Sequence, residues 1–113
     1  MQSGEIMLGY FPFGDITGAK LRPLLLLTGP IGTGTEVIAA YISSVIPATL
    51  LASDILLDTA QPFCQSTRLK VVSVLRLHKI ATVHTSVLQR YIGFAGSVLR
   101  QEVEAKMKIV LKL

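Results

Sequence analysis

The stretch Gly14-Asp15-Ile16-Thr17-Gly18-Ala19-Lys20-Leu21-Arg22-Pro23, which leads into Leu24-Leu25-Leu26-Leu27, decides how the rest of the chain is interpreted. Gly, Asp and Thr are typical of a polar loop, because glycine tolerates positive φ and the Asp and Thr side chains satisfy local backbone donors. Pro23 holds Arg22 extended, and four consecutive leucines require burial on both faces of a strand. We therefore predict a loop that ends at Arg22, where a core strand begins and the guanidinium can meet an anion.

Outward from this strand, short β-forming runs alternate with turns. The expected strands are Glu5–Phe11, Pro23–Thr28, Glu36–Ser43, Asp54–Asp58 and Ser73–Leu77, with short pieces at Val83 and Ile92–Phe94. The glycine-rich turn 29–34 predicts an antiparallel hairpin of the second and third strands, and Thr59–Val71 is expected to be loop.

The last part of the chain changes period. After Gly96, Ser97 is the predicted N-cap of a helix, and Leu99, Val103, Met107 and Val110 recur at helical spacing. We therefore predict one domain over residues 1–113, mainly β with helices (α+β): a small, mostly antiparallel β-barrel closed by a C-terminal helix.

Composition limits the classes of function. Eleven Lys and Arg against seven Asp and Glu give a net charge of +4, which favours anionic partners. Cys64 is the only cysteine, so we expect no disulfide framework, a small apolar role for this residue and a reducing cytoplasm. The residues Met1–Glu5 lack the build of a signal peptide. Ser, Pro and Thr interrupt the uncharged run between Glu36 and Asp54, so we expect no membrane span.

Two apparent motifs are set aside. Leu24–Thr35 has the outline of a strand and a phosphate-binding P-loop, but that motif continues from its last glycine with Lys and then Ser or Thr. Here Gly34 is followed by Thr35 and Glu36, so we interpret Gly29, Gly32 and Gly34 as turn residues. His78 and His84 are joined by no cluster of Cys or acidic residues, so no metal site and no cofactor is predicted.

A set of cationic and hydroxyl groups remains at the expected strand ends: Arg22, Ser43, Ser44, Ser73, Arg76 and Lys79. A cation can stabilise the charge on a phosphorane, and hydroxyl groups can hold its non-bridging oxygens. RNA brings its own nucleophile, the 2′-hydroxyl group. This combination is compatible with a metal-independent phosphodiester site.

The order of several motifs resembles that of the MazF/PemK-like toxin family. The motifs are Gly4-Glu5-Ile6, Phe11-Pro12, Gly18–Pro23, Ala40–Ser44 and Ser73–Thr82, and the likeness extends from Gly4 to about Leu111. This resemblance implies an SH3-like barrel and a homodimeric, metal-independent endoribonuclease (mRNA interferase) of a type II toxin–antitoxin system. It also implies a single-stranded mRNA substrate and an acidic antitoxin partner that fills the RNA groove, in a complex that binds DNA.

The resemblance also assigns residues. Arg22 falls on the family's catalytic arginine, and Ser43 falls where the family usually has a catalytic threonine. The positions expected to contact RNA are Lys20, Ser44, Arg68, Lys70, Arg76 and Lys79. Arg68 stands where a glycine is common, and His78 stands where several members carry an acid.

Two other functions remain open. Some toxins of this barrel type bind DNA gyrase and cut nothing, and an inactivated homologue would act only as a binding module. The presence of both Arg22 and Ser43 favours cleavage, because a pure binding protein has no need of a hydroxyl group beside an arginine.

Overall fold

The structure, a computed structural model, describes residues 1–12 and 21–113. The elements are β1 (Glu5–Tyr10), β2 (Leu21–Leu26), β3 (Glu36–Ser43), β4 (Asp54–Leu57), β5 (Ser73–His84), β6 (Leu88–Phe94), the 3₁₀ helices η1 (Pro62–Thr67) and η2 (Thr85–Val87), and α1 (Ser97–Leu111). The strands form one six-stranded sheet in the order β4-β5-β3-β2-β1-β6. Every neighbouring pair is antiparallel, which confirms the predicted class.

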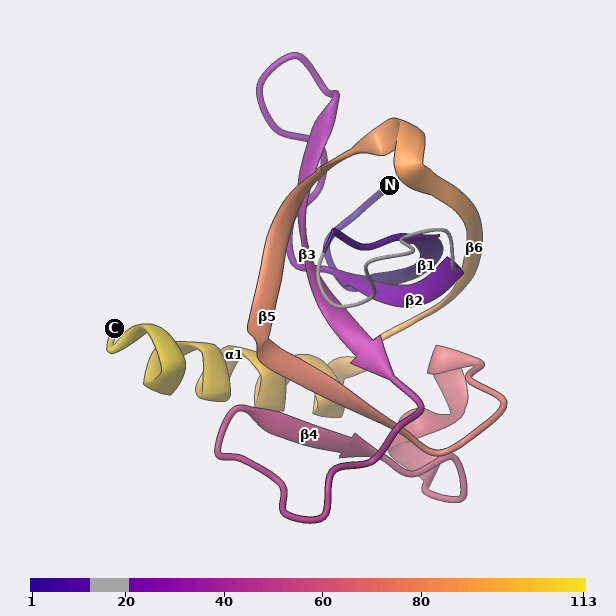
Figure 1. The fold of residues 1–113 in the computed structure, drawn as a ribbon, viewed down its shortest axis with the longest axis vertical. Helices are drawn as coiled ribbons and strands as arrows, with labels where there is room; N and C mark the ends of the chain where they lie inside the picture. The colour runs from indigo at the N-terminus through magenta and orange to yellow at the C-terminus, as the bar shows by residue number, and fades with distance from the viewer. Residues whose placement is uncertain (13–20) are drawn as a thin grey trace.

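The sheet curls without closing, because its edge strands β4 and β6 do not pair with each other. Figure 1 shows β5 and β6 on opposite sides of β1 and β2. Helix α1 lies below β1 and β2 in this view and contacts β5. The pairing of β3 with β5 contains a bulge on β5. Ala40 pairs with Ile80 but Tyr41 pairs with Arg76, so residues 77–79 have no partner on β3. Extra residues on one strand of a pair bend that strand and increase its twist.

The leucine run is buried on both faces of the sheet, as predicted. Leu24 and Leu26 enter a cluster with Val37 and Val83. Leu25 enters a second cluster on the other face, which contains Ile42, Leu75 and Leu99 and against which Val103 and Met107 of α1 pack. A strand alternates its side chains between faces, so one central strand contributes to two apolar layers. These layers fix β2 and β3, from which the candidate site projects.

Several sequence-based boundaries are wrong. β2 spans Leu21–Leu26 and not Pro23–Thr28, so Arg22 lies within the strand, and β6 begins at Leu88 and not at Ile92. Gly96, not Ser97, is the N-cap of α1, and no side chain caps the helix. The segment expected to be loop contains η1, which starts with Pro62 at a position that suits the fixed φ of proline. The separate pieces at Ser73–Leu77 and Val83 belong to one strand, β5. The bulge hides this continuity, because it breaks the two-residue alternation that identifies a strand.

Candidate functional site

The site begins with the face of the sheet that carries Tyr41. Cross-strand pairing places Leu24 opposite Tyr41, Tyr41 opposite Arg76 and Arg76 opposite Asp54. Residues directly opposite on paired strands share a face, and so do residues two positions apart on one strand. Arg22 and Ser43 lie two positions from Leu24 and Tyr41, and therefore share this face. We call this surface, defined by Arg22, Leu24, Tyr41, Ser43, Asp54 and Arg76, the Tyr41 face.

Arg22 and Ser43 stand on neighbouring strands. The pairing of β2 and β3 runs from Leu26 with Ala39 to Leu24 with Tyr41. The pairing ends there, and Arg22 and Ser43 each lie two residues beyond it, on the same face of neighbouring strands. Pro23 between Arg22 and Leu24 has no N–H, which suits the end of the ladder. The strand geometry thus brings the predicted arginine and hydroxyl into one neighbourhood, although the described contacts include no bond between them.

The Ser43 hydroxyl is tied to the turn that follows β3. The Val45 N–H donates to Ser43 Oγ at 3.1 Å, and Ser43 Oγ lies 3.4 Å from the Val45 carbonyl oxygen. The residue is 8% exposed, whereas Arg22 is half-buried and Ser44 is exposed. The turn fixes the position of the oxygen, which limits its freedom to meet a ligand.

Arg76 is held by an acid that the sequence analysis did not assign to the site. Its Nε donates to Asp54 Oδ1 at 2.9 Å and its Nη2 donates to Asp54 Oδ2 at 3.3 Å. The Asp54 side chain is fully buried, and the Leu51 N–H donates to Oδ2 at 2.8 Å. Burial would raise the pKa of Asp54, but these hydrogen bonds and the charges of Arg76 and His78 lower it below its ordinary value.

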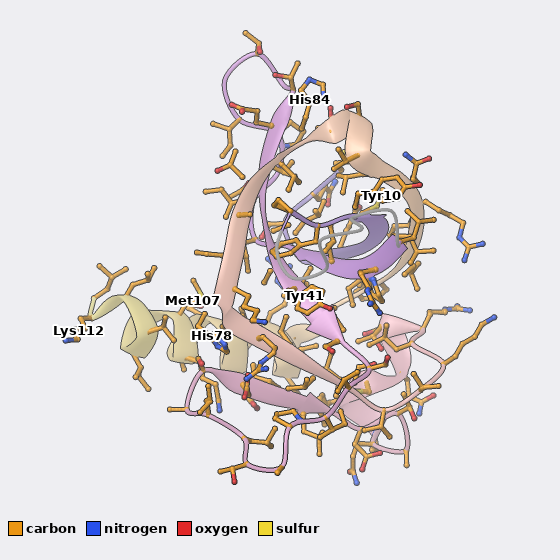
Figure 2. The ribbon with its side chains drawn as sticks, in the orientation of Figure 1. Tyr10, Tyr41, His78, His84, Met107 and Lys112 are labelled. Carbon is orange, nitrogen blue, oxygen red and sulfur yellow. The ribbon has the colours of Figure 1, made fainter. Side chains whose placement is uncertain are left out.

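Tyr41 lies between an aromatic ring and a cation. The rings of Phe11 and Tyr41 stack with their centroids 5.2 Å apart. Lys79 Nζ lies 5.6 Å from the centroid of Tyr41, within the range of a cation–π contact. Figure 2 shows Tyr41 in the middle of the molecule, by the end of β3. Lys79 therefore lies beside the Tyr41 face, and its expected contact with RNA stays a prediction.

The other predicted RNA contacts are not brought together in the same way. Lys20 and the loop Gly14–Lys20 lie outside the described residues. Arg68 and Lys70 are exposed after η1, a helix that packs against β6 and α1. Arg68 has φ 57°, a left-handed conformation that glycine adopts at little cost, which accounts for the glycine common at this position. Ser73 is buried and donates to the Val71 carbonyl oxygen at 2.9 Å.

The two histidines occupy different parts of the molecule. Figure 2 places His84 at one end of the structure and His78 beside α1 and β4. His78 Nδ1 lies 2.6 Å from Ser53 Oγ in a hydrogen bond and 3.9 Å from Asp54 Oδ1. Sequence reasoning missed both Ser53 and Asp54. The sequence offered one indication of a role for Asp54: this residue is the first charged one after Glu36, and it begins an expected strand.

Several other features bear on the classes of site. No group of three His, Cys, Asp or Glu side chains gathers in residues 1–12 and 21–113. A cavity of about 640 Å³ between α1 and the start of the chain contains none of the predicted site residues, being lined by residues such as Leu25, Arg100 and Met107. Burial raises the pKa of the Cys64 thiol, with Asp58 adding to the shift, so the thiol stays neutral in the core. In the part of the chain that is described, no helix has the length and apolar character needed to span a membrane.

Comparison with known proteins defines the class. A model of the PemK-like, MazF-like toxins of type II toxin–antitoxin systems matches residues 2–111. The chain therefore belongs to this toxin family. The comparison with curated proteins found no match.

Solved structures share the fold at low sequence identity. The Mycobacterium tuberculosis toxin MazF-mt6 has a TM-score of 0.73 and 21% identity, covering 96% of this chain and 97% of its own. A MazE–MazF structure from Deinococcus radiodurans has a TM-score of 0.74 and 16% identity, covering 100% and 97%. An endoribonuclease in complex with its cognate antitoxin, from mycobacterial species, has a TM-score of 0.72 and 13% identity, covering 100% and 96%.

Proposed function

We propose that this toxin is a metal-independent endoribonuclease that cleaves single-stranded mRNA at short sequences. The observation that carries the proposal is the position of Arg22 and Ser43 on one face of adjacent strands, each two residues beyond the Leu24–Tyr41 pair. The family match supports a toxin, and two solved structures of the same fold are described as endoribonucleases.

The reaction follows from the groups available. The 2′-hydroxyl group of the RNA loses its proton to water as its oxygen attacks the adjacent phosphorus, and the bond from phosphorus to the 5′-oxygen breaks. The Arg22 guanidinium stabilises the negative charge of the phosphorane and donates a hydrogen bond to the leaving 5′-oxygen, which takes up a proton from water. The Ser43 hydroxyl holds a non-bridging oxygen. The products are a 2′,3′-cyclic phosphate, which water can open to a 3′-phosphate, and a 5′-hydroxyl end.

The direct test is cleavage of a single-stranded RNA in EDTA. Wild-type protein should cut the RNA, and Arg22→Ala should lower the rate by at least about 100-fold, because a donor to the developing charge is lost. Arg90→Ala is the matched control. Arg90 is exposed on β6 opposite Leu8, on the other face of the sheet from Arg22, and its loss should leave the rate unchanged. Loss of wild-type cleavage in EDTA would contradict the metal-independent mechanism.

The expected partners follow from the same proposal. An acidic antitoxin would bind the Tyr41 face beside Arg22 and Lys79, and would block RNA there. The toxin would act in the cytoplasm as a homodimer in which both subunits line the RNA groove. A solved structure of this fold contains MazF together with MazE. By analogy, we propose that this chain also binds an antitoxin.

One observation favours a second function, a toxin that binds a protein target and does not cut RNA. The Ser43 oxygen already accepts a hydrogen bond and is nearly buried, so its catalytic use requires the turn at Val45 to adjust. The same RNA assay separates the two functions. If wild-type protein and Arg22→Ala leave the RNA equally intact, the binding function replaces the enzymatic one.

A further inference from the structure

Asp54 and Arg76 form a pair that the cleavage chemistry above does not use. Arg76 donates through Nε and Nη2, so the carboxylate covers one side of the guanidinium. An arginine has five N–H donors, and this side-on pairing uses two of them. Among the described contacts, the remaining N–H groups on Nη1 and Nη2 have no partner. The guanidinium is thus fixed on one edge and free on the other.

The acid itself is rigidly placed. Its side chain is fully buried and accepts the Leu51 N–H, while the Asp54 carbonyl oxygen accepts a hydrogen bond from Lys106 Nζ at 3.0 Å. The acid is therefore anchored by the β3–β4 connection and by α1, as well as by β5. A carboxylate held in this way fixes the plane of the guanidinium that it binds.

The place of the pair relates it to Arg22 and Ser43. Arg76 is opposite Tyr41, and Ser43 is two residues further along β3 on the same face. Two residues along a strand span about 6.6–6.8 Å, so Arg76 lies close to Ser43 but not directly opposite it. The Arg76 side chain is 18% exposed, so part of it reaches solvent.

We propose that Asp54 is a positioning residue, which orients Arg76 so that the free edge of the guanidinium binds an RNA phosphate next to the one that is cleaved. This inference depends on the proposed RNA cleavage. The pair has no net charge, so its contribution to RNA binding comes from geometry and not from long-range attraction.

The decisive variant is Asp54→Asn, because two explanations predict opposite results. Removing the carboxylate makes the protein more positive, so an effect of charge alone would tighten RNA binding. Loss of orientation should instead raise the KM for RNA roughly tenfold and leave kcat nearly unchanged. The reason is that the variant weakens a hydrogen bond between charged groups, and this bond is made in both the ground state and the transition state. Arg76→Ala should show the same pattern, and Asp54→Asn should add little in the Arg76→Ala background.

A modified substrate tests the idea without altering the protein. RNA with neutral methylphosphonate linkages beside the cleaved position should bind wild-type protein roughly tenfold more weakly than ordinary RNA. Arg76→Ala and Asp54→Asn should distinguish the two substrates far less. Arg90→Ala is the matched control, because it removes an exposed arginine on the other face of the sheet and leaves the Asp54–Arg76 pair intact, and its KM should be that of wild type.

The outcomes separate this inference from the proposed function. Absence of cleavage by wild-type protein overturns the endoribonuclease. Cleavage that is lost in Arg22→Ala, together with an Asp54→Asn variant that binds RNA as tightly as wild type or more tightly, overturns the positioning role alone. Equal sensitivity of wild type and Arg76→Ala to the methylphosphonate would also overturn it, even if Asp54→Asn failed to fold.

Discussion

At the scale of single residues, Asp54 should make the stability of the protein depend on pH. Its pKa is lowered in the folded state from an ordinary value of 3.8, so the folded protein binds this proton less readily than the unfolded chain. The stabilisation is therefore present above about pH 4 and is lost as the pH falls through the lower, folded-state pKa.

We expect Asp54→Asn to lower the free energy of unfolding by about 2–4 kcal/mol at neutral pH, because a buried ion pair loses one partner. Urea unfolding of both proteins from pH 7 to pH 2.5 checks this prediction. The difference in the free energy of unfolding should be widest near pH 7 and should shrink below pH 4. A difference that stays constant across this range would show that the ionised carboxylate is not its source.

Residue identity alone singled out neither part of the candidate site. Arg22 and Ser43 stood among several cations and hydroxyls at expected strand ends, and only the family resemblance singled them out as catalytic, a role that stays a prediction. The partner of Arg76 could not be predicted, because Asp54 meets it only through the register of β4 with β5. The hydrogen bond between His78 and Ser53 likewise joins residues that are 25 positions apart in the sequence.

At the scale of elements, the contact between β6 and η1 depends on Gly93. A Cβ added there would lie 2.5 Å from the carbonyl oxygens of Ser66 and Thr67, which belong to the backbone of η1. We expect Gly93→Ala to destabilise the protein by about 1–3 kcal/mol through overpacking. The control is Gly29→Ala, where the nearest atom to an added Cβ is 3.6 Å away and the change should be within about 0.5 kcal/mol. Thermal unfolding compares the two, and equal melting temperatures would contradict this account of the interface.

The elements themselves were predictable where the sequence pattern is local. The run of leucines, the turn 29–34 and the apolar stripe of α1 each specify their structure over a few residues. β5 was predicted only in pieces, because its bulge at residues 77–79 depends on pairing with β3 and not on local propensity. η1 was missed because a helix of this length carries too few residues to show a periodic pattern.

At the scale of the whole molecule, several large apolar side chains remain exposed. Val45, Leu51, Val71, Val98, Ile109 and Leu113 are each more than half exposed. Exposed apolar side chains of this kind, when they form a contiguous patch, mark protein–protein interfaces. The net charge of +4 favours an anionic partner.

If the active toxin is a homodimer with an RNA groove lined by both subunits, cleavage must depend on protein concentration. We expect the rate per chain to stay constant above the dimer dissociation constant and to fall in proportion to the fraction of dimer below it, because a monomer presents only half of the groove. Sedimentation velocity over the same concentration range gives the dissociation constant independently, and the two midpoints should coincide. Arg22→Ala mixed in excess with wild-type protein provides a second check, since heterodimers place one defective subunit at each groove and should lower the rate. A monomer that cleaves RNA at the full rate per chain would show that each Tyr41 face works alone, with Arg22 and Ser43 of one subunit sufficient for the reaction.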